Sequence, residues 1–305
     1  MPQFGIPGDL VRYNNRISAV PNLWHLPKAT WEPIWKIYGG DEVKVAVLDT
    51  GYSRHPDLPE PIEAESFVRG EQVEDGNGHG SHCCGTAVGR NGLGVAPRAK
   101  LLVGKVLSNS GSGGSDGIAQ GIRWAVDQGA HIISMSLGGG SSYGPTNEAI
   151  KYAWSKGCIT NAAAGNAGYN GRNTVGWPAK FSECMCTGAI GPGGSIANFS
   201  SGGVELDYAT PGVDIISCRA GSSDYTSMSG TSMSTPFMSG LLALILQGMW
   251  SEGVPTFTGA NGLRSFAEKW CDDVGETGKD VRFGYGIPRY EAIAEYLQMK
   301  ALVMV

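Results

Sequence analysis

The sequence has no long hydrophobic run and no excess of positive charge. Its longest uninterrupted apolar segment, 241–246, is far shorter than the roughly 20 residues that a membrane-spanning helix needs. The N-terminus lacks a basic stretch followed by an apolar one, so no secretory signal is expected. The formal net charge is −5 at pH 7, which disfavours nucleic acid as a partner. We therefore expect neither a membrane nor a nucleic acid to be the partner.

Cysteine is sparse and irregularly spaced. The chain has seven cysteines, an odd number, including the adjacent Cys83 and Cys84 and the close pair Cys184 and Cys186. Neither pair has the spacing of a zinc site or of a small disulfide framework. We expect mostly reduced thiols and therefore a cytoplasmic or other intracellular location. The sequence leaves the oligomeric state open.

The chain itself is long enough for one large α/β domain. It has 305 residues, of which 41% are hydrophobic and 47 are glycine, so many tight turns are expected. Predicted strands alternate with predicted helices, which favours a parallel, doubly wound sheet. The predicted strands are 43–49, 100–106, 132–137 and 158–164, and the predicted helices are 83–88, 117–128 and 147–156, with a shorter one in 21–40. Two closing helices are expected at 260–270 and 290–301.

A serine-rich turn precedes the most apolar segment of the chain. Residues 229–236 read SGTSMSTP, and apolar residues follow at helical spacing from Phe237 onward. Ser232 is therefore expected in the first turn of a helix, beside unpaired main-chain N–H groups and the positive end of the helix dipole. A serine in this place is either an N-cap or a nucleophile whose reaction develops negative charge.

Three further polar residues follow strands or stand among glycines. Asp49 ends the strand at 43–49, His79 lies within DGNGHGSH, and Asn166 follows the strand at 158–164. A serine becomes an effective nucleophile when a histidine takes its proton and a carboxylate orients that histidine. An amide donor stabilises the oxyanion of the tetrahedral intermediate. His55 and His82 are interpreted as structural.

The chain order Asp, His, Ser separates this set from the α/β-hydrolases and from the chymotrypsin type. The chain resembles the subtilisin family of serine proteases, the subtilases, over about residues 21–250. The motifs that carry the resemblance are VAVLDTG around Asp49, DGNGHGSHCCGT around His79, SMSLGGG at 134–140, AAAGNAG at 162–168 and SGTSMSTP around Ser232.

The resemblance implies a fold and a reaction. The fold would be a three-layer α/β domain over 21–305, preceded by an extension, 1–20. The reaction would be hydrolysis of peptide bonds in polypeptides through an acyl-enzyme, with no cofactor needed for catalysis. Ser232 would be the nucleophile, His79 the general base and then acid, and Asp49 its orienter. The Asn166 amide and the main-chain N–H of Ser232 would form the oxyanion hole.

The resemblance also implies where the substrate lies, because subtilases hold an extended peptide as an added strand. The residues expected to line it are Ser112, Gly113, Gly114, Ser136, Leu137, Gly138, Gly139, Ala163, Gly165 and Gly176. Gly176 leaves the floor of the P1 pocket open, and Ala167 supplies no acid there. Large apolar P1 side chains are therefore expected to be preferred over basic ones.

Metal binding is predicted at one place only. The segment 89–97 is shorter than the calcium-binding loop of many subtilisins, so that calcium site is expected to be missing. This short segment and the cysteine at position 83 are similar to proteinase K. A weaker structural calcium site is predicted near Ala179, Phe181, Glu205 and Asp207. The alternative for these acids is a purely structural role at the surface.

The extension, 1–20, contains Phe4-Gly5-Ile6-Pro7, which is similar to an apolar-Pro motif of intracellular subtilisins. This stretch would lie along the substrate groove and inhibit the enzyme. Pro7 would resist cleavage because it has no N–H. The alternative is a frayed terminus. Two other functions stay open: a peptide ligase or macrocyclase of the same fold, and a catalytically inactive peptide-binding module.

Overall fold

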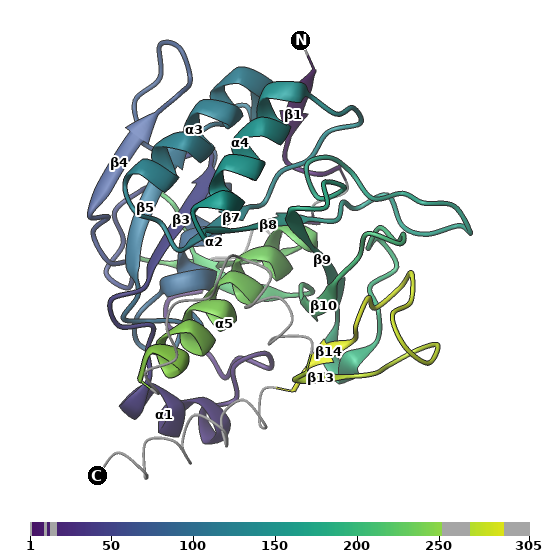
Figure 1. The fold of residues 1–305 in the computed structure, drawn as a ribbon. Helices are drawn as coiled ribbons and strands as arrows, with labels where there is room; N and C mark the ends of the chain where they lie inside the picture. The colour runs from purple at the N-terminus through teal and green to yellow at the C-terminus, as the bar shows by residue number, and fades with distance from the viewer. Residues whose placement is uncertain (1, 9–10, 13–16, 252–268, 290–305) are drawn as a thin grey trace.

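A sheet of seven parallel strands forms the centre of the fold (Figure 1). The computed structural model describes residues 2–8, 11–12, 17–251 and 269–289. In spatial order the strands are β10 (Tyr208–Pro211), β9 (Cys184–Ile190), β8 (Ile159–Ala163), β7 (Ile132–Met135), β3 (Lys44–Asp49), β5 (Lys100–Lys105) and β4 (Glu63–Ser66).

Helices cover both faces of the sheet and make the fold three-layered, as predicted (Figure 1). Helices α3 (Ser115–Asp127) and α4 (Gly144–Ser155) pack together on one face. Helices α2 (His79–Val88) and α5 (Thr231–Ser251) pack together on the other. Because both faces are buried, β3 is apolar on both sides: Val45 and Val47 join the α2–α5 core, while Ala46 and Leu48 join the α3–α4 core.

Helix α5 is buried along nearly its whole length, which explains its uniformly apolar sequence. It packs so closely against α2 and Val95 that no side chain larger than that of glycine fits at position 240 of α5. A Cβ atom on Gly240 would lie 2.7 Å from the Cβ of Val95 and 2.8 Å from the carbonyl oxygen of Ala87. The helix that begins beside Ser232 is thus fixed firmly in the core. Helix α1 (Lys28–Ile37) joins the same core through Trp31 and Ile34.

The direction of the chain through the sheet reverses beside β3. From β3 the chain proceeds to β4 and β5 on one side, and then returns to β7, β8, β9 and β10 on the other. In open α/β sheets, ligands bind outside the carboxyl ends of the strands at such a reversal. Asp49 is the last residue of β3, so it lies at this point.

Short antiparallel strands surround the central sheet. Strand β1 (Gln3–Gly5) pairs with β6 (Ser112–Gly114), and β2 (Val11–Arg12) extends the hairpin of β11 (Ile215–Cys218) and β12 (Tyr225–Ser229). Near the C-terminal end of the described chain, β13 (Cys271–Asp272) pairs with β14 (Ile287–Pro288). Residues 3–5 and 11–12 of the extension, 1–20, are therefore strands that pair with the rest of the chain.

The predicted elements up to residue 164 are confirmed, with ends displaced by a few residues. The helix predicted within 21–40 is α1, and the apolar run after Ser232 is α5. The sequence did not predict β4 or the four strands from β9 to β12. The helices expected at 260–270 and 290–301 lie outside the described residues, except for 269–270, which form a turn.

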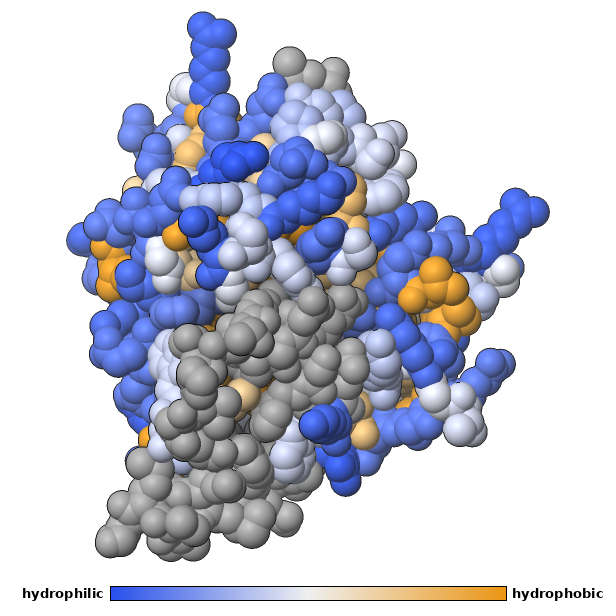
Figure 2. Space-filling model, viewed as in Figure 1, coloured by the Kyte–Doolittle hydropathy of each residue, from blue (hydrophilic) through white to orange (hydrophobic). Residues whose placement is uncertain are grey.

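The described surface is mainly polar, as the face drawn in Figure 2 illustrates. The large apolar side chains that are most exposed, Ile37, Ile62 and Val204, come from separate parts of the chain. Among the described residues, none of the helices combines the length and the apolar character needed to cross a membrane.

Candidate active site

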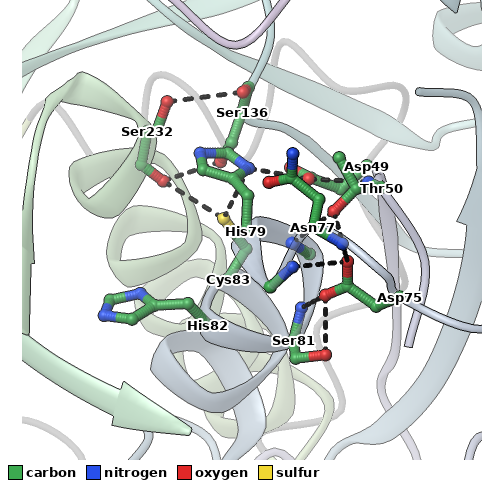
Figure 3. Close-up of polar contacts among 12 residues, drawn as sticks. Asp49, Thr50, Asp75, Asn77, His79, Ser81, His82, Cys83, Ser136 and Ser232 are labelled. Carbon is green, nitrogen blue, oxygen red and sulfur yellow. Dashed lines mark hydrogen bonds and ion pairs between the residues drawn. The ribbon is translucent and has the colours of Figure 1, made fainter. Parts of the chain in front are cut away.

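Asp49 and His79 form a buried pair at the carboxyl end of the sheet (Figure 3). Asp49 ends β3 and His79 begins α2. The distance between His79 Nδ1 and Asp49 Oδ1 is 2.7 Å, and the same oxygen accepts the main-chain N–H of Thr50 at 2.7 Å. The carboxylate thus holds the Nδ1 side of the ring, which leaves Nε2 as the atom that can accept a proton.

Ser232 lies beside this pair, in the first turn of α5. Its hydroxyl lies 3.4 Å from the carbonyl oxygen of Ser136, and its own carbonyl accepts the Ser136 hydroxyl at 2.7 Å. His79 Nε2 is buried and has no hydrogen-bond partner among the described residues, so the serine–histidine bond is not closed. Such bonds are often long without substrate and tighten when it binds.

Asn166 lies where β8 leads into the site, and its amide has one fixed orientation. Its Oδ1 accepts the main-chain N–H of Thr231 at 2.9 Å and the Thr231 hydroxyl at 2.8 Å. Its Nδ2 is buried and has no partner among the described residues. The amide therefore offers two unused N–H groups next to the start of α5. Buried donors of this kind suit an oxyanion.

Cys83, one turn after His79 on α2, completes the cluster. Its Sγ lies 3.8 Å from His79 Nδ1 and 3.5 Å from the carbonyl oxygen of Ser232. Burial and, secondarily, the charge of Asp49 hold the pKa of the Cys83 thiol well above its usual value. Within the described part of the chain, Asp49, His79 and Cys83 are the one group of three potential ligands whose atoms converge, all within 4.8 Å. Because two of them already share a hydrogen bond, this group is not a preformed metal site.

The two acids predicted to bind calcium have protein partners instead. Asp207 Oδ2 accepts the main-chain N–H of Cys186 at 2.9 Å, and Oδ1 lies 3.1 Å from the Lys279 ammonium. Glu205 accepts the side-chain amide of Asn173 at 2.7 Å. Ala179 and Phe181 lie in the α3–α4 core. An ammonium beside Asp207 fills the role of a cation, so these residues as they stand do not fit a calcium ion.

The two segments predicted to flank the substrate lie side by side with a gap one strand wide. One is β6, and the other is 136–139, which follows β7. Strand β1 fills the gap: Gly5 exchanges both main-chain hydrogen bonds with Gly138, at 3.0 and 2.9 Å, and Ile6 donates to the Gly111 carbonyl at 3.0 Å. The Phe4 side chain, 1% exposed, packs against Gly139.

The walls predicted for the P1 pocket also come together. Gly139 exchanges main-chain hydrogen bonds with Trp177, at 2.8 and 2.9 Å, and Gly176 donates to the Ala164 carbonyl at 2.9 Å. A Cβ atom on Gly176 would lie 3.4 Å from the carbonyl oxygen of Gly139. Gly176 therefore lies between the two walls. The predicted wall residue Ala163 is the last residue of β8, and Gly165 donates to the Thr231 hydroxyl at 3.2 Å.

The histidines interpreted as structural have main-chain partners. His55 Nε2 lies 3.0 Å from the Asp224 carbonyl oxygen, and His82 Nε2 lies 3.0 Å from that of Ile215. Sequence reasoning missed Thr231, which orients Asn166. Its signal was a second hydroxyl residue directly before Ser232, at the start of the predicted helix.

Comparisons with known proteins match most of the chain to one family. The profile of the Subtilase family matches residues 40–286. Subtilisin DY of Bacillus licheniformis is 39% identical over 265 residues, which cover 85% of this chain and 93% of that protein. Subtilisin Savinase of Lederbergia lenta is 45% identical over 213 residues, covering 68% and 77%. Thermitase of Thermoactinomyces vulgaris is 39% identical over 252 residues, covering 80% and 86%.

Proposed function

This chain is a serine protease of the subtilase family, and we propose that it is an endopeptidase that hydrolyses peptide bonds through an acyl-enzyme formed on Ser232. Subtilases act on polypeptides and need no cofactor for catalysis. The single observation that carries the detailed proposal is the buried hydrogen bond of 2.7 Å between Asp49 and His79 beside Ser232.

In the proposed reaction, His79 Nε2 takes the Ser232 proton as Oγ attacks the substrate carbonyl. Asp49 keeps the ring oriented and stabilises its positive charge. The free N–H groups of Asn166 and the main-chain N–H of Ser232 receive the oxyanion. His79 then protonates the leaving amine, and water resolves the acyl-enzyme. The mechanism assigns no step to calcium.

A labelling experiment tests this function against its two alternatives. A fluorophosphonate probe is expected to label Ser232 in the full chain and not in Ser232→Ala. Mass analysis of a cleaved peptide is then expected to show products that have gained water. Products that have gained an amine would identify a ligase. A chain that is folded and stays unlabelled both with and without residues 1–20 would be an inactive binding module.

We also propose a preference for large apolar P1 side chains. Two observations support it: Gly176 leaves the space between the pocket walls unfilled, and Ala167 is uncharged and exposed. A peptide library is expected to show cleavage after Phe, Leu or Met. Ala167→Glu is expected to add cleavage after Lys, because it places a carboxylate at the pocket. Dominant cleavage after Lys or Arg by the unaltered chain would contradict the proposal.

Residues 1–20 are proposed to inhibit the protease in cis. The support is the pairing of β1 with both edges of the groove, together with the burial of the proposed nucleophile, since Ser232 and His79 are 0% exposed. In an antiparallel pairing, partners run in opposite order. Because Gly5 is opposite Gly138, the same register would bring Pro7 level with Ser136, whose carbonyl lies beside Ser232.

A reducing, intracellular environment is the last part of the proposal. It is supported by the cysteines: all seven lie in the described part of the chain, none of them forms a disulfide there, and six are buried. Disulfides are rare where thiols are kept reduced. Counting free thiols in protein isolated from its source under alkylating conditions is expected to give seven.

A further inference from the structure

Helix α2, which carries His79, has no cap of its own. The residue before it, Gly78, has a φ of 91° and no side chain, and the first turn holds no acidic residue. The first N–H groups of a helix have no partner inside the helix. Their acceptors must therefore come from another part of the chain.

Asp75 accepts one of these N–H groups and two more from the residues just before the helix (Figure 3). Its Oδ2 accepts the main-chain N–H of Ser81 at 2.8 Å and the Ser81 hydroxyl at 2.7 Å. Its Oδ1 accepts the main-chain N–H groups of Gly78 at 2.8 Å and of Asn77 at 3.1 Å. This carboxylate, 4% exposed, therefore holds the chain on both sides of His79.

Thr50 connects the same carboxylate to Asp49. The Thr50 hydroxyl donates to Asp75 Oδ1 at 2.8 Å and accepts the main-chain N–H of Gly80 at 2.8 Å. The Thr50 N–H donates to Asp49 Oδ1, the oxygen that bonds His79. Thr50 thus links Asp75 to both halves of the Asp49–His79 pair: its hydroxyl contacts the first turn of α2, and its N–H contacts Asp49.

The end of β3 and the start of α2 also touch without free space. A Cβ atom on Gly80 would lie 2.4 Å from the carbonyl oxygen of Gly51, and one on Gly51 would lie 2.1 Å from that of Val73. Because this contact is so close, any displacement of Asp75 would also displace the first turn of α2.

Asp75 carries its charge at neutral pH. Burial alone raises the pKa of Asp75, but the hydrogen bonds from Ser81, Gly78 and Thr50 outweigh burial, and the pKa is lowered. The negative charge lies at the positive end of the α2 dipole and close to the ring that becomes positive during the reaction.

We propose that Asp75 is a positioning residue of this protease. Its carboxylate fixes the His79 ring against Asp49, and its charge stabilises the imidazolium that forms when Ser232 attacks. The role rests on the proposed function, because it presupposes that His79 is the base.

The test is Asp75→Asn in the full chain, so that any inhibition by residues 1–20 acts equally on both proteins. Active sites are counted with a fluorophosphonate, and turnover of a small chromogenic peptide is expressed per labelled site. We expect kcat per site to fall about ten- to a hundredfold, as small misplacements of reacting groups do, with KM within about twofold. We also expect the acidic limb of kcat to move to lower pH, because a negative charge near His79 is lost.

Asp57→Asn is the matched control. Asp57 is as buried as Asp75, at 5% exposed, and is bonded by the Asn91 amide at 2.6 Å and by the Tyr225 hydroxyl. It has no hydrogen bond to the first turn of α2. We expect this control to lower stability while kcat per site and the pH profile stay unchanged.

A second pair of variants applies if Asp75→Asn does not fold. Thr50→Val removes the linking hydroxyl and is expected to lower kcat per site, whereas Thr50→Ser keeps the hydroxyl and is expected to restore it. The proposal is overturned if Asp75→Asn, or Thr50→Val in its place, keeps kcat per site within about twofold of the unaltered chain and keeps its pH profile. A complete lack of label on the folded chain, both with and without residues 1–20, would instead refute the proposed function.

Discussion

At residue scale, the amide of Asn166 is oriented by a neighbour that does not take part in the reaction. Thr231 donates both its N–H and its hydroxyl to Asn166 Oδ1. If the Asn166 amide were turned over, its own NH₂ group would face these two donors. The orientation of this amide follows from the hydrogen bonds alone. A donor fixed before the substrate arrives needs no reorganisation during the reaction.

Asn166→Ala is therefore expected to lower kcat about a hundred- to a thousandfold with little change in KM, the range known from the loss of such a donor in a subtilisin. Thr231→Val is expected to lower kcat less, because it removes one of the two bonds to Oδ1, and Thr231→Ser is expected to retain activity. Steady-state kinetics normalised to labelled sites measures both effects. A loss confined to KM would show that the amide binds ground-state substrate instead.

Cys83 gives a second prediction at residue scale. Because its sulfur lies 3.8 Å from His79 Nδ1, a metal atom bound to it would displace the ring from Asp49. A small organomercurial is expected to inhibit turnover slowly, since the thiol is buried, and Cys83→Ala is expected to be resistant. Persistent activity after one equivalent of mercury has bound Cys83, located by mass spectrometry, would contradict this.

At the scale of elements, the extension pairs with two strands that are far apart in the sequence, β6 and β12. Strand β1 pairs with the edge formed by β6 and Gly138, and β2 pairs with Met228 and Ser229 at the end of β12, two residues before α5 begins. A substrate bound as an added strand needs the same main-chain groups. Under the proposed function, β1 and a substrate would therefore compete for the main-chain groups of β6 and Gly138.

Deletion of residues 1–8 or 1–20 is expected to raise activity on a small peptide at least tenfold without changing the circular dichroism spectrum, since each buried apolar anchor contributes about 1.5 to 3 kcal/mol. Phe4→Asp is expected to act in the same direction, because Phe4 is buried in the α3–α4 core. Gln3→Asp, at an exposed position of the same strand, is the matched control and should leave inhibition intact. Equal activity of intact and truncated chains, verified by mass, would remove the inhibitory role.

The parts of this site that were predictable from the sequence are those in which chemistry restricts the residue type. Asp49, His79, Asn166 and Ser232 lie at strand ends and helix starts, where short glycine-rich motifs mark them. The Asp75 network was not predictable, because its carboxylate is shared among donors distant in the sequence, and only the fold brings Thr50 to it. Strands β9 to β12 were missed for a related reason. Tertiary burial makes them strands, while their many small and polar residues, as in 225–229 (YTSMS), show no clear alternation.

At the scale of the whole molecule, the core contains histidines that folding keeps neutral. His25 is 3% exposed, neither of its ring nitrogens has a partner among the described residues, and burial lowers its pKa from 6.5 to about 3. Burial, and next the neighbouring His79, lowers the pKa of His82 to about 3. In the unfolded chain both rings take up protons near pH 6.5. Acid therefore favours the unfolded state, and the penalty grows from pH 6.5 down to about pH 3.

The lowered pKa of Asp75 also makes the folded state less stable in acid, but at lower pH than the histidines do. A carboxyl with a lowered pKa stabilises the fold above its unfolded value near 3.9, and this stabilisation is lost as the pH falls below that value. Between pH 6.5 and 4.5 the histidines therefore dominate. Each contributes a loss of about 1.4 kcal/mol per pH unit in the free energy of unfolding.

The substitution His25→Phe separates the contribution of His25 to acid destabilisation from those of His82 and Asp75. The ring of His25 packs at 5.6 Å from that of Trp24 and 6.2 Å from that of Phe237, so a phenyl ring suits the site and has no proton to bind. Denaturant unfolding is measured in the Ser232→Ala background to prevent self-digestion.

At pH 7.5 the free energies of unfolding of the two proteins are expected to differ by less than about 1.5 kcal/mol, as conservative core exchanges do. At pH 4.5 the His25→Phe chain is expected to gain about 2 to 3 kcal/mol relative to the parent, because two pH units of proton uptake by the unfolded state are removed. Parallel stability curves between these two pH values would show that His25 is protonated, or bound to water, in the folded core.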